Sequence, residues 1–138
     1  IGGYAFYKCK SLTAMPVNNK LKTIGKAAFY GCTSLKTLTV GGKVITIGES
    51  AFGGCSKMTA VSIGTNVKTI GASAFSGCKS LATVKVGSAK LKTVSKNAFK
   101  GTKSKITFKI PKKYYKSYMA KIKAKGVAAP KNAIYKKY

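Results

Sequence analysis

The chain lacks most of the side chains on which catalysis depends. Its 138 residues contain no Arg, His, Asp or Trp, and Glu49 is the single acid. General acid–base catalysis usually needs His or a pair of carboxylates, zinc sites need closely spaced Cys and His, and calcium or magnesium sites need clustered carboxylates. A Gly-rich phosphate-binding motif of the Walker or dinucleotide type is also absent. We therefore expect no enzymatic activity, no metal site and no cofactor.

Long apolar runs are missing as well. No run approaches the roughly 20 residues that a helix needs to cross a bilayer, so we expect no transmembrane segment. The chain starts at Ile1, inside a repeat, with neither a Met nor a leader, and it therefore resembles a fragment or a processed product. On that view, the missing leader says nothing about secretion.

Negative charge is almost absent, and positive charge comes from one residue type. All 27 basic residues are Lys, which gives a formal net charge of +26. Such a charge attracts any polyanion. Nucleic-acid-binding proteins usually use Arg for bidentate contacts, however, so we do not expect nucleic acid as a partner. A second interpretation is that Lys keeps a sheet-rich stack soluble and protects its edges from pairing with other chains.

The chain does contain a repeated sequence motif. Each copy begins with an Ala-Phe pair, and the first four copies end at cysteines with a constant spacing, Cys9, Cys32, Cys55 and Cys78. A fifth pair, Ala98-Phe99, comes one residue late. A fixed period of about 20–50 residues is typical of repeat proteins, whose similar turns bury their apolar sides against one another. The sequence divides into five turns, at 1–23, 24–46, 47–69, 70–93 and 94–111.

Two apolar patterns within each turn predict two short strands. The first is an L-x-x-L-x-L spacing, seen at Leu35, Leu38 and Val40, whose last two members alternate with a polar residue as in a half-buried strand. The second is a β-branched pair such as Val67 and Ile70 that stops at Gly or Ser. Between them we expect a bend in which the Phe residues form the spine of the core, with positive φ at Gly31, Gly54, Gly77 and Gly101.

The phrase I-G-x-x-A-F-x-G-C-x-S-L-x-x-V-x-I resembles the BspA-like leucine-rich repeats, also called the Treponema pallidum type. The resemblance covers residues 1 to about 111. It implies a mainly β solenoid, a right-handed superhelix, carried by bacterial surface or secreted proteins that act in adhesion. The chain departs from the pattern at Pro16, which stands in a predicted strand, and at Thr102 and Lys105, which replace Cys and Leu. Both departures fall in end repeats, where atypical residues are expected.

The cysteines allow two interpretations. An even number in a secreted protein often indicates disulfides, and stacked strands would place equivalent Cα atoms about 4.8 Å apart, within the range that a bridge tolerates. Side chains in one register point the same way, however, and reduced thiols behave as small buried hydrophobes with a weak donor. We favour buried, reduced thiols that donate to turn backbone, because Thr102 also offers a small donor but cannot form a bridge.

The pattern changes after Pro111. Tyr115, Tyr118, Met119 and Ile122 follow helical spacing, which predicts an amphipathic capping helix over 112–126, closed by Gly126. A basic amphipathic helix lying on an anionic membrane is the alternative. We expect residues 127–138 to form an irregular basic tail. No comparable cap precedes Ile1, so we expect further repeats before it or end-to-end association there.

Two surfaces are candidates for binding a partner. Outward positions of the main predicted sheet form columns that begin at Ala14 and Pro16. The candidate face consists of Thr37, Thr39, Ser62, Thr83, Lys85, Thr107 and Lys109. A candidate basic column runs along the other strand, at Lys22, Lys68 and Lys92, and is broken by Ile45. The alternative for the first surface is a solvated face in which Thr is present because strands favour it.

The resemblance and the charge together suggest two functions. The first is a non-catalytic module, extracellular or on the bacterial surface, that binds host matrix proteins, other extracellular proteins or glycans in adhesion. The second is a Lys-rich structural element that binds acidic glycans or other anionic polymers of the cell envelope. Salt separates the two, because binding to a polyanion weakens steeply as ionic strength rises.

Overall fold

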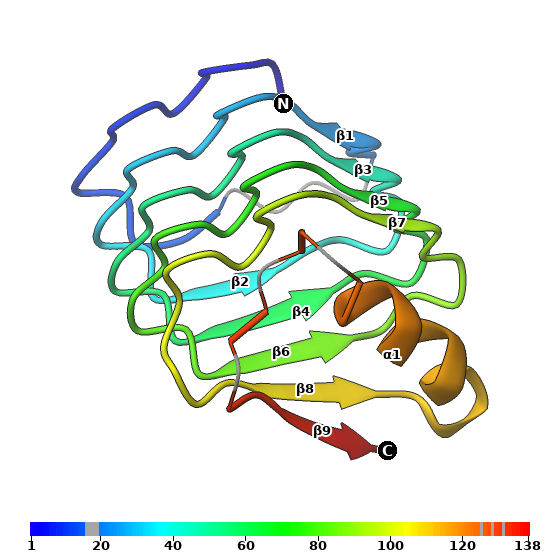
Figure 1. Cartoon of the computed structure of the whole chain (residues 1–138). Coiled ribbons are helices and arrows are strands. Elements are labelled where there is room, and N and C mark those ends of the chain that lie inside the picture. Colours follow the sequence, from blue (N-terminus) through cyan, green and yellow to red (C-terminus); the bar gives the residue numbers. More distant parts are fainter. Residues whose placement is uncertain (16–19, 125, 128, 131) are drawn as a thin grey trace.

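The computed structural model describes residues 1–15, 20–124, 126–127, 129–130 and 132–138, and it is a stack of β-coils (Figure 1). From Thr23 to Ile110, each coil contributes one strand to each of two sheets, and the two ends of the chain lie at opposite ends of the stack. The predicted mainly β solenoid of about five similar turns, followed by one helix, is confirmed. The strand predicted around Pro16 lies outside the described residues.

Both sheets are built from parallel strands. The four-stranded sheet contains two-residue strands, in the order β1 (Thr23–Ile24), β3 (Thr46–Ile47), β5 (Thr69–Ile70) and β7 (Thr93–Val94). The five-stranded sheet has the order β2 (Thr37–Thr39), β4 (Ala60–Ile63), β6 (Thr83–Val86), β8 (Thr107–Ile110) and β9 (Ile134–Lys137). Equivalent residues of successive turns are partners, so like side chains form columns.

The strands follow from the alternation in the sequence. In β4, Val61 and Ile63 are buried while Ala60 and Ser62 lie on the outward side, and β6 repeats the pattern. A period of two is what places alternate side chains on opposite faces of a strand. Residues of the Ile24 column, one per turn, are buried in the facing sheet. The two sheets therefore enclose a single apolar interior.

The phenylalanines stack along the length of that interior. Successive rings, from Phe6 through Phe29, Phe52 and Phe75 to Phe99, have centroids 5.0–5.6 Å apart and planes 4–8° apart. The last ring meets Phe108 of β8 edge-on, at 5.1 Å. Aromatic pairs at such distances contribute about 0.5–1.5 kcal/mol beyond the burial of their surface. The predicted spine is confirmed.

Backbone conformation repeats in the bend that carries each Phe. The four glycines predicted to have positive φ do so, with φ of 70–72°. A second position with positive φ lies directly before each Ala-Phe pair and is occupied by other residue types, among them Ser50 with φ 52° and Ser73 with φ 54°. A glycine is favoured in this region because it has no Cβ.

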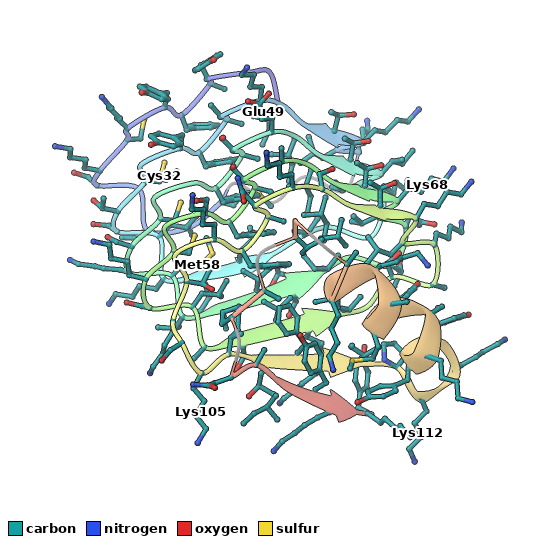
Figure 2. The ribbon with its side chains drawn as sticks, in the orientation of Figure 1. Cys32, Glu49, Met58, Lys68, Lys105 and Lys112 are labelled. Carbon is teal, nitrogen blue, oxygen red and sulfur yellow. The ribbon has the colours of Figure 1, made fainter. Side chains whose placement is uncertain are left out.

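The cysteine thiols are free and form the ladder that the sequence favours. Three of them donate to the carbonyl of the Phe one turn earlier, from Cys32 to Phe6 at 3.0 Å, from Cys55 to Phe29 at 3.3 Å and from Cys78 to Phe52 at 3.1 Å. Figure 2 shows Cys32 and Met58 among the coils. Two details differ from the prediction. Cys9 is exposed because no described turn covers it, and Thr102 donates to Phe99 of its own turn, at 2.9 Å.

In the fifth repeat, the buried position that Leu occupies in the pattern is filled by a neighbouring residue. Lys105, which replaces Leu in the pattern, is exposed and extends outward in Figure 2. The adjacent Ile106 is fully buried instead. The core position is therefore kept by a shift of one residue within this turn.

The C-terminal segment covers the end of the stack. After η1 (Lys112–Tyr114), helix α1 (Tyr115–Ile122) lies against β7 with Tyr118 and Ile122 buried, as expected for a cap. The Tyr118 hydroxyl donates to the Ser88 carbonyl at 2.6 Å and accepts from the Leu91 N–H at 3.3 Å. The helix ends at Ile122, well before Gly126, which was predicted to close it.

Residues 134–137 form a strand, and the prediction of an irregular tail is wrong for this segment. The strand, β9, pairs with β8 in register. Tyr135 stacks on Phe108 with centroids 5.4 Å apart and planes 11° apart. The apolar column of the sheet thus continues through Tyr135, and the tail supplies a further strand because that column would otherwise end uncovered.

Candidate functional site

The outward face of the five-stranded sheet brings together the residues of the first candidate surface. Register places them in two columns across the strands, Thr37–Ala60–Thr83–Thr107–Ile134 and Thr39–Ser62–Lys85–Lys109–Lys136. Their side chains are exposed or half-buried. Of the two predicted starting points, Ala14 is exposed and in no strand, and Pro16 lies outside the described residues.

Lysines occupy one column of this face at its C-terminal end. Lys85 is the partner of Lys109, and Lys109 is the partner of Lys136, so three ammonium groups stand on consecutive strands. Neighbouring strands are about 4.8 Å apart, and like charges directly opposite each other destabilise a sheet. The single acidic side chain, Glu49, pairs instead with Lys26 at 3.2 Å, and this hydrogen bond raises the pKa of Lys26.

Sequence reasoning missed Lys136 and Ile134, because it assigned no strand to their segment. The β-branched and aromatic pair Ile134-Tyr135 is a signal that could have indicated a strand. The strand is too short, however, for an alternation of apolar and polar residues to be recognised. The aromatic Tyr138, next along the chain, also reaches this face. Its hydroxyl donates to the Val86 carbonyl at 3.0 Å, and the Lys85 ammonium lies 5.0 Å from its ring centroid.

The predicted basic column on the other strand is also a column in space. The Ile45 N–H donates to the Lys22 carbonyl at 2.7 Å, and the Lys68 N–H donates to the Ile45 carbonyl at 2.8 Å. The Lys92 N–H donates to the Lys68 carbonyl in the same way, at 2.8 Å. These residues directly precede the strands of the four-stranded sheet. In Figure 2 the Lys68 side chain extends outward at this edge of the stack.

A recess that the sequence analysis did not predict lies beside this column. It has a volume of about 250 Å³ and is lined by Lys22, Lys43, Ile45, Asn66, Lys68 and Lys90. The lining comes from successive turns, at the corner where the chain passes from the five-stranded to the four-stranded sheet. Lys43 and Asn66 are separated by one repeat, so the period was a usable signal that these side chains are neighbours.

Two of the buried thiols, Cys32 and Cys55, are poorly suited to a reactive site. Burial raises the pKa of Cys32 to about 11, and a hydrogen bond with the Cys78 side chain, followed by burial, raises the pKa of Cys55 above its ordinary value. Because the thiolate is the nucleophile and the metal ligand, a raised pKa makes these groups inert near neutral pH. Among the described residues, no three His, Cys, Asp or Glu side chains gather in a way that could hold a metal ion. The same part of the chain contains no helix long and apolar enough to span a bilayer.

Comparison with known proteins agrees with this architecture. The family model of the BspA type leucine-rich repeat region matches residues 1–120 in six copies. A comparison with curated proteins found no match. Among solved structures, the pneumococcal vaccine antigen PcpA superposes with a TM-score of 0.76 at 24% identity, over 98% of this chain and 33% of that one. A leucine-rich repeat protein from Bacteroides ovatus ATCC 8483 gives a TM-score of 0.51 at 22% identity, over 80% of this chain and 42% of that one.

These likenesses have different weights. At these identities, the solved structures support the fold alone, and the chain spans only about a third of the length of the pneumococcal antigen. The family match, in contrast, extends over most of the chain and agrees with the coils, the Phe stack and the thiol ladder. The chain therefore belongs to the family of BspA type leucine-rich repeat proteins.

Proposed function

We propose that this chain is a non-catalytic module of a bacterial surface or secreted protein, and that it acts in adhesion by binding an extracellular protein. The binding surface in this proposal is the outward face of the five-stranded sheet. The observation that carries it is the continuity of that face, which presents two columns of side chains over five strands in register. Sheet faces of solenoids commonly serve as extended binding surfaces.

The chemistry of the face suits contact with a protein. Thr39, Ser62 and Thr83 offer hydroxyls that both donate and accept hydrogen bonds, and their short side chains lose little entropy when a partner covers them. Lys85 and Lys109 favour a partner with acidic groups at one end of the contact. The fold supports a binding role over a catalytic one, since leucine-rich repeat solenoids are typically non-catalytic. The likeness to a pneumococcal vaccine antigen motivates the placement at the cell surface.

A second function is favoured by one specific observation. The unneutralised column Lys85–Lys109–Lys136 would be stabilised by an anionic polymer laid across the strands, because the polymer would relieve the repulsion between these ammonium groups. We propose as the alternative that the chain is a Lys-rich structural element bound to anionic polymers of the cell envelope.

A matched pair of substitutions tests the protein-binding face. Thr83→Tyr places a bulky side chain at the centre of the five-stranded sheet, and Thr69→Tyr places the same side chain on a central strand of the other sheet. Both variants and the parent chain are screened against arrays of extracellular matrix proteins and of neutral and acidic glycans. We expect at least about a tenfold loss of protein binding for Thr83→Tyr and none for Thr69→Tyr.

Salt distinguishes the alternative. Binding to an envelope polymer should weaken steeply between about 50 and 200 mM salt, and Lys109→Gln should reduce that dependence while Lys57→Gln, an exposed lysine elsewhere, should not. Equal effects of Thr83→Tyr and Thr69→Tyr, or no binding to any protein at low salt, would exclude the protein-binding face.

A further inference from the structure

The recess at the corner between the two sheets differs from the rest of the lysine-rich surface because it has an apolar floor. Ile45 is 38% exposed there, at a position whose register neighbours in the adjacent turns, Lys22 and Lys68, are both lysines. A single exposed Ile is ordinary on a protein surface. This one lies in a concavity that is otherwise lined by Asn66 and by four lysines, Lys22, Lys43, Lys68 and Lys90.

Asn66 gives the recess a polar wall with further hydrogen-bonding capacity. Its Nδ2 donates to the Gly42 carbonyl at 2.6 Å, and its Oδ1 accepts from the Lys90 ammonium at 2.7 Å. A primary amide has two N–H donors and an oxygen that accepts two bonds, so one donor and one acceptor site remain beyond these two bonds. The two bonds join three successive turns, which holds the amide in place and ties Lys90 to the rim.

Together, the lysines, the apolar floor and the Asn66 amide indicate which kind of ligand the recess can bind. The lysine ammonium groups only donate hydrogen bonds and favour an anion, the apolar floor favours a ligand with a flat hydrocarbon face, and the spare donor and acceptor of Asn66 match hydroxyl groups. A volume of about 250 Å³ is below the usual range for a whole drug-sized ligand, and it suits one monomer of a longer chain. An acidic sugar residue has all three features, since its ring carries C–H groups, hydroxyls and a carboxylate or sulfate.

We infer that this recess binds one acidic sugar residue of an anionic polysaccharide. The ring lies over Ile45, the anionic group is held by Lys22 and Lys68, and a hydroxyl contacts Asn66. An acidic peptide would satisfy the lysines but would leave the Ile45 floor and the Asn66 hydrogen bonds unmatched. The inference is independent of the proposed protein-binding face, which lies on the other sheet.

Calorimetric titration of the whole chain tests the inference with three probes. These are a trimer of galacturonic acid, a neutral trimer of galactose, and tripolyphosphate, which has the charge but no ring. We expect binding of the galacturonate trimer, none of the galactose trimer, and weaker binding of tripolyphosphate. Amide chemical shifts measured by NMR should move at Ile45 and Asn66 when the galacturonate trimer is added.

Two variants separate shape from charge. Ile45→Lys raises the positive charge but removes the floor, and lysines already occupy the equivalent positions in neighbouring turns, so the fold accepts the change. We expect it to weaken galacturonate binding at least about tenfold, while tripolyphosphate binds as well or better. Lys68→Gln should weaken galacturonate binding about tenfold, because a charge-assisted hydrogen bond is lost. Lys57→Gln, which changes the charge equally at an exposed position outside the recess, should leave it unchanged.

Three outcomes would overturn the inference. Tighter galacturonate binding by Ile45→Lys would mean that net charge alone is responsible. Equal losses for Lys68→Gln and Lys57→Gln would mean that the recess is not the site. Tighter binding of a glutamate tripeptide than of the galacturonate trimer would assign the recess to acidic proteins. None of these results bears on the Thr83→Tyr test of the proposed function.

Discussion

The ring of Phe52 lies parallel to the ring of Phe75, with centroids 5.6 Å apart and planes 4° apart. Both rings are fully buried, and each belongs to a different coil. The contact therefore joins coils that are one full repeat apart in the sequence. It continues through the neighbouring turns in both directions, which makes the Phe stack the main apolar link along the axis of the solenoid.

Phe52→Ala should lower the free energy of unfolding by about 3–5 kcal/mol, because it leaves a cavity between two rings that cannot close without bending the coils. Urea unfolding followed by circular dichroism measures the change, with the slope of the transition checked for equal cooperativity. Tyr7→Ala is the control, since Tyr7 is an aromatic in the same kind of bend but is 41% exposed. A loss below about 1 kcal/mol for Phe52→Ala would contradict the role of the stack.

The Cys32 thiol should make stability depend on pH in the alkaline range. Burial raises its pKa from 9.0 to about 11, so above pH 9 the unfolded state loses this proton before the folded state does. The folded state then binds more protons than the unfolded state, and the stability contributed by the buried thiol decreases between about pH 9 and pH 11. The measurement is the difference in unfolding free energy between the parent chain and Cys32→Ala, which cancels the titration of the lysines. A difference that stays constant across this range would contradict the prediction.

Two substitutions in one bend should have opposite effects. A Cβ at Gly71 would lie 2.6 Å from the carbonyl carbon of Gly48 in the preceding coil, so Gly71→Ala should cost about 1–3 kcal/mol. Ser73 has φ 54°, a conformation that costs an L-residue about 1–2 kcal/mol. Ser73→Gly removes that cost but makes the unfolded chain more flexible, and we expect a change between zero and about 1 kcal/mol of stabilisation. Thermal unfolding of both variants compares the two positions directly, and a destabilised Ser73→Gly would show that the serine side chain matters more than its φ.

Removal of the Tyr118 hydroxyl should loosen the C-terminal cap. Tyr118→Phe leaves the Ser88 carbonyl and the Leu91 N–H without this partner, in a buried position, at an expected cost of about 1–3 kcal/mol. Hydrogen exchange should show faster exchange at Leu91 and in α1, with the central coils unchanged. Tyr7→Phe is the matched control at an exposed site. Equal protection of the α1 amides from exchange in Tyr118→Phe and in Tyr7→Phe would indicate that apolar packing alone holds the helix.

The fold was predictable from the sequence because the same structural pattern recurs in each repeat. Each repeat carries its own alternating strand, its Ala-Phe pair and its glycine, so Val61, Phe52 and Gly54 are each supported by their equivalents in the neighbouring repeats. The departures occur where this redundancy ends. Ile106 takes the core position of Lys105 in the last repeat, and Cys9 is exposed where no described coil covers it.

The candidate surfaces were only partly predictable. Register alone places Thr83 next to Thr107 and Lys68 next to Lys92. Lys136 was missed because β9 pairs for a non-local reason, namely that Tyr135 covers Phe108 at the end of the sheet. The recess was missed because its rim depends on how the Asn66 amide joins the neighbouring turns.

The period, the coil and its apolar interior follow from the sequence alone, because local alternation and a fixed repeat dictate which side chains are buried. What the ends and corners of the stack present depends on contacts between coils. At these places, helix α1, strand β9 and the apolar floor of the recess are positioned by contacts with other coils. Such contacts leave no periodic signal in the sequence of the segment that makes them.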